Sequence, residues 1–236
     1  MFKKNKKAVD TASEVCEFYR AHSKQQHRSN MRTKALLLAA AVAAGGLATA
    51  AAQTVYSINT VGYVNMVIPA GFSMIANPLN TTNNTISALM PSAPDGTTVY
   101  KYTGTGFAIS VIDDTGEWSN PNLTLNPGEG CFIRSPRQFT NTFVGEVMQG
   151  RLTNSYPAGF SIRASQVPQQ GTASELGFVP PEGTAIYKLR AGGSGYDIFI
   201  TDDVGWVVEP TFRVGESFWL RSSTPGAWVR QFSVNP

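Results

Sequence analysis

Neighbouring carboxylates are the residues whose types and spacing come closest to a catalytic or metal-binding pattern. They form two pairs, Asp113-Asp114 and Asp202-Asp203, and in each case a glycine lies two positions after the second Asp. Paired carboxylates catalyse glycoside hydrolysis, and clustered carboxylates bind Ca²⁺. The Asp-Asp-x-Gly pattern is also typical of a tight turn in which Asp side chains accept hydrogen bonds from backbone N–H groups. We favour the turn, with a weak calcium site and a catalytic pair as the alternatives.

Aromatic side chains offer a second kind of chemistry, because their flat apolar faces can stack on sugar rings. Two tryptophans follow the Asp-Asp turns, and we expect both to be exposed near one end of each half of the chain. Trp219 and Trp228 lie in apolar segments, so we expect them to face the core. Core packing of all these side chains is the alternative hypothesis. The predicted ligand-binding residues are Trp118, Trp206, Tyr102 and Tyr196.

Several catalytic chemistries are missing from residues 53–236. This part of the chain has no histidine, because His22 and His27 both precede it, so sites that need histidine are excluded there. Its single cysteine, Cys131, lies in an apolar run and corresponds to Phe218 later in the chain, which indicates a buried hydrophobic role. No glycine-rich phosphate loop occurs. We therefore expect no enzymatic activity and no cofactor other than calcium.

A secretory signal peptide is predicted at residues 31–52. A basic start is followed by a short apolar run that ends in small residues. The run is shorter than the roughly 20 residues that span a bilayer. We expect cleavage near Ala50 to Ala52, export to the cell surface, the periplasm or the medium, and no transmembrane segment in the mature chain. We interpret residues 1–30 as a non-native or disordered extension upstream of a start at Met31.

Removal of residues 1–52 reverses the net charge of the protein. The whole chain carries +3, but this segment holds nine of the 19 Lys and Arg residues and three of the 16 acids. Residues 53–236 therefore have 10 basic and 13 acidic residues and a net charge of −3. A mildly acidic chain lacks the basic footprint of nucleic-acid-binding proteins. We expect no nucleic-acid partner.

An internal repeat predicts two β modules, at residues 53–147 and 148–236. The sequence Pro-Ala-Gly-Phe-Ser at 69–73 returns at 157–161, and the segment at 128–135 matches that at 215–222. Short β-branched and aromatic runs alternate with turn residues, which is typical of all-β sandwiches or barrel-like modules. We expect six or seven strands and one short helical turn in each module.

Two charged residues recur in both modules, as Glu129 with Glu216 and Arg134 with Arg221. Each Glu lies five positions before its Arg along one predicted strand. An odd spacing places the two side chains on opposite faces of a regular strand. We interpret all four as structural hydrogen-bonding groups.

Three motifs carry a resemblance to a known family. They are PAGFSMIANPLN at 69–80, GTTVYKY at 96–102 and LNPGEGCFIRSP at 125–136. The pattern resembles an uncharacterised family of secreted tandem-repeat β proteins of Verrucomicrobia-type bacteria, over about residues 55–236. The second module departs from it, with ASQVP at 164–168 where the first has ANPLN. The resemblance implies export and a β fold, and it implies no activity.

Export, duplication and the lack of catalytic groups lead to one functional hypothesis. We expect a secreted or cell-envelope protein that binds a partner or has a structural role without catalysis. Extracellular polysaccharide and envelope proteins are the expected partners, and self-association is possible for two such modules. The alternative is a carboxylate-dependent glycan-acting enzyme, or an accessory domain of one, which would need two acids in one cleft.

Overall fold

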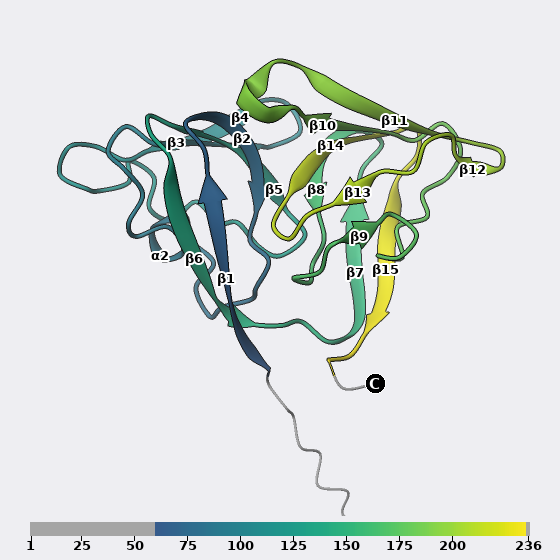
Figure 1. Cartoon of the computed structure of the whole chain (residues 1–236), viewed down its shortest axis with the longest axis horizontal. Coiled ribbons are helices and arrows are strands. Elements are labelled where there is room, and N and C mark those ends of the chain that lie inside the picture. The colour runs from purple at the N-terminus through teal and green to yellow at the C-terminus, as the bar shows by residue number, and fades with distance from the viewer. Residues whose placement is uncertain (1–59, 235–236) are drawn as a thin grey trace, which may run out of the picture. The chain divides into compact units, whose positions relative to one another are not determined.

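The computed structural model describes residues 60–234 (Figure 1). The predicted N-terminal extension and signal peptide lie outside the described residues. Strands dominate the described chain, and the expectation of an all-β fold is confirmed. Within residues 60–234, no helix combines the length and the apolar character needed to cross a membrane.

Six strands come from the first half of the described chain. All are short and rich in β-branched or aromatic residues, and most have Gly, Pro, Asn or Asp at or near their ends, as the sequence pattern indicated. The strands are β1 (Val61–Ile68), β2 (Gly71–Ala76), β3 (Thr98–Tyr102), β4 (Phe107–Val111), β5 (Gly130–Ser135) and β6 (Phe139–Glu146).

The second half contributes six longer strands and three two-residue strands. The longer strands are β7 (Gly150–Tyr156), β8 (Gly159–Ala164), β10 (Ala185–Leu189), β11 (Tyr196–Asp202), β14 (Ser217–Ser222) and β15 (Gly226–Phe232). The two-residue strands are β9 (Gly171–Thr172), β12 (Gly205–Trp206) and β13 (Thr211–Phe212).

The larger sheets of the two halves pair their strands in the same order. In the first half the order is β2-β5-β3-β4, and in the second it is β8-β14-β10-β11, with β12 added at the edge. Each half also has a separate antiparallel pair, β1 with β6 and β7 with β15. Figure 1 shows the first pair on the left and the second pair on the right.

One short helical turn was expected in each half, and an α-helix is present only in the first half of the described chain. Helix α2 (Ile86–Leu89) begins after Thr85, whose hydroxyl oxygen accepts a hydrogen bond from the Ala88 N–H. The matching segment at 172–178 forms turns that follow β9 and has no α-helix. A 3₁₀ turn, η2 (Ala191–Gly193), lies in the connection between β10 and β11.

Each half has its own hydrophobic core on one side of its larger sheet. In β5, Cys131 and Ile133 are fully buried in the first core, whereas Phe132 is partly exposed and Arg134 is exposed. In β14, Phe218 and Leu220 are buried in the second core, whereas Trp219 and Arg221 alternate with them on the other side. The sides that face away from the cores therefore carry large aromatic residues.

Reciprocal backbone hydrogen bonds join the two halves. The Ala76 N–H donates to the Gly215 carbonyl oxygen at 2.8 Å, and the Ala164 N–H donates to the Gly128 carbonyl oxygen at 3.0 Å. These residues occupy corresponding positions in the two repeats, so each half makes the same contact with the other. The halves are thus held in one arrangement, and residues 60–234 belong to one compact unit.

Close packing at Gly130 keeps this junction tight. A Cβ atom built on Gly130 would lie 2.3 Å from the Ser217 Cβ and 2.6 Å from the Ile162 Cγ2. Neither distance is tolerated between carbon atoms, so the start of β5 can approach the other half this closely only with a glycine at position 130. The aromatic side chains that follow along β5 and β14 are consequently brought together.

Candidate functional site

Aromatic rings from both halves meet on the sides of the sheets that face away from the cores. Cross-strand partners share one side of a sheet, and Tyr100 pairs with Phe132 as Tyr187 pairs with Trp219. We call this surface the aromatic face. It comprises Phe72, Tyr100, Tyr102, Phe107, Phe132, Phe160, Tyr187, Tyr196 and Trp219.

Trp219 is the residue that connects the rings of the two halves. Its ring centroid lies 4.8 Å from that of Tyr102 and 5.9 Å from that of Phe132, both in the first half. It also lies 5.9 Å from the Phe160 centroid, in an edge-to-face arrangement. Such tilted contacts are the favoured geometry for aromatic pairs and hold each ring in a defined position. The rings therefore form one connected surface.

An open groove lies within the aromatic face. It has a volume of about 440 Å³, in the range of small-molecule sites. Tyr102 reaches it from β3, and four side chains of the second half complete it. The lining residues are Tyr102, Phe160, Tyr187, Tyr196 and Trp219. None of the five carries a charge, so the groove offers ring faces and tyrosine hydroxyl groups to a ligand.

The aromatic positions correspond between the two repeats. Phe72 matches Phe160 and Tyr100 matches Tyr187 in sequence and in strand position. In the same way, the rings of Phe107 and Phe132 in the first half correspond to those of Tyr196 and Trp219 in the second. Both halves thus place large rings on the side of the larger sheet that faces away from the hydrophobic core of that half.

Two of the four predicted ligand-binding residues lie in this groove, namely Tyr102 and Tyr196. The expectation that Trp118 is exposed was wrong. Trp118 bridges to the buried Ile112, is 6% exposed, and its indole N–H donates to the Met90 carbonyl oxygen at 3.4 Å. Trp206 is partly buried against the second core, where its ring centroid lies 6.0 Å from that of Phe178.

The two tryptophans expected to face inward behave differently from each other. Trp228 is 6% exposed, and its indole N–H donates to the Leu176 carbonyl oxygen at 2.9 Å. Trp219 faces away from the core, so the expectation for it was wrong. The sequence does hold a signal for this outcome, because the exposed Arg221 lies two residues after Trp219 on the same side of β14.

The carboxylate pairs form turns. One carboxylate oxygen of Asp113 accepts hydrogen bonds from the Thr115 hydroxyl at 2.6 Å and from the Glu117 N–H at 3.0 Å. The Thr115 hydroxyl, followed by the Glu117 N–H, holds the pKa of Asp113 below its ordinary value. Asp202 likewise accepts from the Gly205 N–H at 3.1 Å.

The second acid of each pair, Asp114 and Asp203, is exposed. Within residues 60–234, no three His, Cys, Asp or Glu side chains are grouped so that they could hold a metal ion.

The recurring glutamates support the junction from the core side of the sheets. Lys101 Nζ lies 2.9 Å from a Glu129 carboxylate oxygen, and Lys188 Nζ lies 3.1 Å from one of Glu216. Glu129 also accepts from the Asn126 N–H at 2.8 Å, which fixes the turn before β5. These matching ion pairs are partly buried. They fix the start of β5, which carries Phe132, and of β14, which carries Trp219; we call Phe132 and Trp219 the central rings of the two halves.

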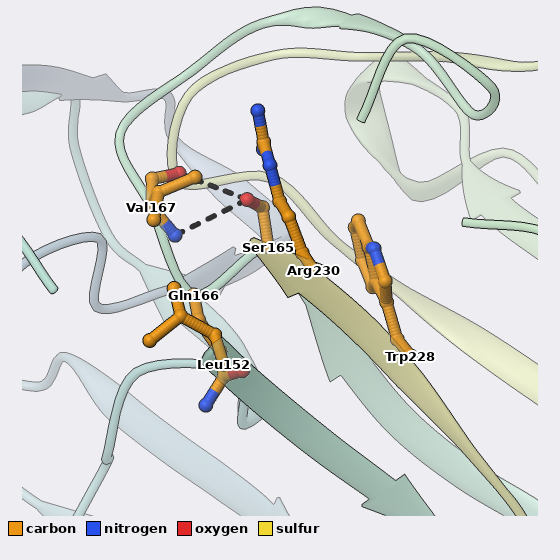
Figure 2. Close-up of a pocket in the computed structure, with 6 residues that line it drawn as sticks. All are labelled: Leu152, Ser165, Gln166, Val167, Trp228 and Arg230. Carbon is orange, nitrogen blue, oxygen red and sulfur yellow. Dashed lines mark hydrogen bonds between the residues drawn. The ribbon is translucent and has the colours of Figure 1, made fainter. Parts of the chain in front are cut away.

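Two other hollows differ from the groove in size and lining. Figure 2 shows one between Trp228, Arg230 and the 165–167 turn, in which the Ser165 hydroxyl bonds to the Val167 backbone. Its volume of about 10 Å³ suffices for one water molecule. A second cleft, of about 240 Å³, lies between β2 and the η2 turn, and its lining includes the charged residues Arg190, Arg213 and Glu216.

Comparison of the chain with protein-family models, curated proteins and solved structures finds no match.

Proposed function

We propose that this protein is an exported, non-catalytic binding protein that attaches to polysaccharide through its aromatic face. The observation that carries the proposal is the groove lined by five aromatic side chains. Pyranose rings present apolar C–H faces that stack on aromatic rings, while tyrosine hydroxyl groups can exchange hydrogen bonds with sugar hydroxyls. The partial exposure of these rings leaves their faces accessible to such a ligand.

The extent of the exposed apolar surface supports binding of an extended partner. Phe72 and Phe160 are 42% and 45% exposed at corresponding places in the two halves, and Ile109 and Ile198 extend the surface farther along the sheets. Contiguous exposed apolar patches of this kind mark interaction surfaces in folded proteins. A polymer would contact Phe72 as well as the groove residues, whereas a small ligand in the groove would contact only its five lining residues.

The arrangement favours binding over glycoside hydrolysis. A carboxylate-dependent hydrolase needs two acids on either side of the scissile bond, about 5–10 Å apart. The groove lining contains no carboxylate. The side chains of Asp113 and Asp202 are engaged with the backbone of their own turns. The five lining residues therefore offer ring faces and hydroxyl groups to a sugar, and none of them is an acid.

Binding of the purified protein to insoluble cellulose, chitin and xylan tests the proposal. We expect Trp219→Ala to weaken binding about tenfold, because truncation of a central aromatic contact typically costs more than 1 kcal/mol. Tyr63→Ala is the matched control, since Tyr63 is 74% exposed on β1 and lies outside the aromatic face. Tyr102→Ala provides a second groove variant. It removes a smaller ring than Trp219→Ala does, which reduces the risk of altered folding.

The proposal is contradicted if the wild-type protein stays in solution with every polysaccharide tested. It is also contradicted if Trp219→Ala and Tyr102→Ala bind as tightly as Tyr63→Ala. Circular dichroism of each variant verifies that the fold is intact.

A further inference from the structure

Two exposed arginines lie beside the aromatic face at corresponding places in the two halves. Arg134 follows Phe132 by two residues along β5, and Arg221 follows Trp219 by two residues along β14. Side chains two residues apart lie on the same side of a strand, about 7 Å apart along it. Each arginine therefore lies on the same side of its strand as the large ring two residues before it, Phe132 or Trp219.

Strand pairing brings each arginine next to a second ring as well. Arg134 pairs with Phe72 on β2, and Arg221 pairs with Phe160 on β8. Cross-strand partners have Cβ atoms about 5 Å apart and share one side of the sheet. Both phenylalanines belong to the aromatic face, so a sugar stacked on either ring would lie within reach of a guanidinium.

Neither arginine is neutralised by a neighbour. Within residues 60–234, neither Arg134 nor Arg221 takes part in an ion pair. The carboxylates at the ends of β4 and β11, Asp113 and Asp202, accept hydrogen bonds from their own turns. An unpaired, fully charged guanidinium beside apolar rings is a ready partner for an anion, and its planar fork matches a carboxylate in a bidentate manner.

We infer that the aromatic face selects polysaccharides that carry carboxylate groups, with Arg134 and Arg221 as the residues that recognise the acid. The inference rests on the proposed function and adds the ligand's chemical class. Stacking on the rings supplies affinity for the sugar ring, and the two cations supply the preference for a charged polymer. Repetition of the Phe-x-Arg and Trp-x-Arg pattern allows two acidic sugars of one chain to be held together.

Matched pairs of probes separate charge from sugar recognition. The first pair is polygalacturonate and its methyl ester, and the second is carboxylated cellulose and plain cellulose. At pH 7 and low salt, we expect the wild-type protein to bind the charged member of each pair about tenfold more tightly, since each exposed ion pair contributes a factor of about two to five. The preference should diminish as salt shortens the screening length.

Variants distinguish the two roles. Arg134→Gln/Arg221→Gln should lose the preference for the charged polymer while it still binds the uncharged one, and Trp219→Ala should lose both. Arg151→Gln is the control, because Arg151 is exposed on β7, away from the aromatic face. Equal binding of charged and uncharged probes, or a preference that survives in the double variant, would overturn this inference alone. Binding of no probe at all contradicts the proposed function itself.

Discussion

Trp219 and Trp118 show how one residue type acquires opposite roles through its surroundings. Trp118 forms an isolated bridge with Ile112 and lies in the first core, where its indole N–H donates to the Met90 carbonyl oxygen. Trp219 alternates with Phe218 and Leu220, which fill the second core, so it is directed away from that core. The rule that large apolar residues are buried therefore does not identify the residues of the aromatic face.

Cys131 is a structural residue of the first core. Burial raises the pKa of its thiol to about 12, from an ordinary value near 9, because the thiolate would lose its hydration. The thiol is therefore protonated at neutral pH and is a poor nucleophile. This agrees with its predicted hydrophobic role, since Phe218 fills the corresponding place in the second core.

The raised pKa of Cys131 leads to a pH-dependent stability. Below pH 9 the thiol is neutral in both the folded and the unfolded chain, so the full contribution to stability is present. Between about pH 9 and 12 only the unfolded chain releases the proton, and the unfolding free energy should fall by about 1 kcal/mol per pH unit. Urea denaturation at pH 8 and pH 10 measures this loss.

Cys131→Ala serves as the reference for this measurement, because it keeps every other titrating group. We expect the wild-type protein to lose about 1 kcal/mol more than Cys131→Ala between pH 8 and pH 10. Equal losses in the two proteins would show that Cys131 is not buried as described.

At the scale of strands, the junction between the halves depends on the missing side chain of Gly130. We expect Gly130→Ala to lower the unfolding free energy by about 1–3 kcal/mol, because the added methyl group would overlap Ser217 and Ile162. Gly106→Ala is the matched control, since a Cβ at Gly106 meets no atom within 4 Å. Its change should stay within about 0.5 kcal/mol. Urea denaturation of both variants at pH 7 tests the contrast.

A Gly130→Ala protein as stable as Gly106→Ala would mean that the halves are less tightly joined than the contacts indicate. The two larger sheets would then be free to separate. The groove would not persist, because Tyr102 comes from one half and the other four lining residues come from the other.

Most strands could be predicted from the sequence, whereas the direction of their side chains could not. Short runs of β-branched and aromatic residues between turn residues were expected to form strands, and β4 and β5 are two such runs. In β5 and β14, however, apolar residues follow one another without a polar residue between them. A period of two cannot then tell which side faces the core. Only the exposed arginine at the end of each run marks the side that faces away from it.

The candidate site was predictable in part for the same reason. Tyr102 and Tyr196 were expected in the ligand-binding set, but Trp219, which connects the rings, was assigned to the core. Its contacts with Tyr102 and Phe132 join residues of different repeats. Such contacts depend on the packing of one half against the other, about which the repeat pattern carries no information.

At the scale of the whole described chain, the repeat creates the aromatic face by placing two similar sheets against each other. Each half contributes rings that would stay largely exposed on a single module, and the reciprocal bonds of Ala76 and Ala164 hold the two sets together. The two halves together thus provide a larger aromatic surface than one half offers. An extended polymer is the kind of ligand that benefits from such a surface.

Hydroxyl-radical footprinting with mass spectrometry, on the protein with and without a bound polysaccharide, tests the central claim most directly. It reads the exposure of each aromatic side chain in the unmodified protein. Binding through the aromatic face predicts that the ligand protects Tyr102 and Trp219 while oxidation of the exposed Tyr63 stays unchanged. Protection of Tyr63 with no protection of Trp219 would contradict the account and place the binding surface on the β1–β6 pair instead.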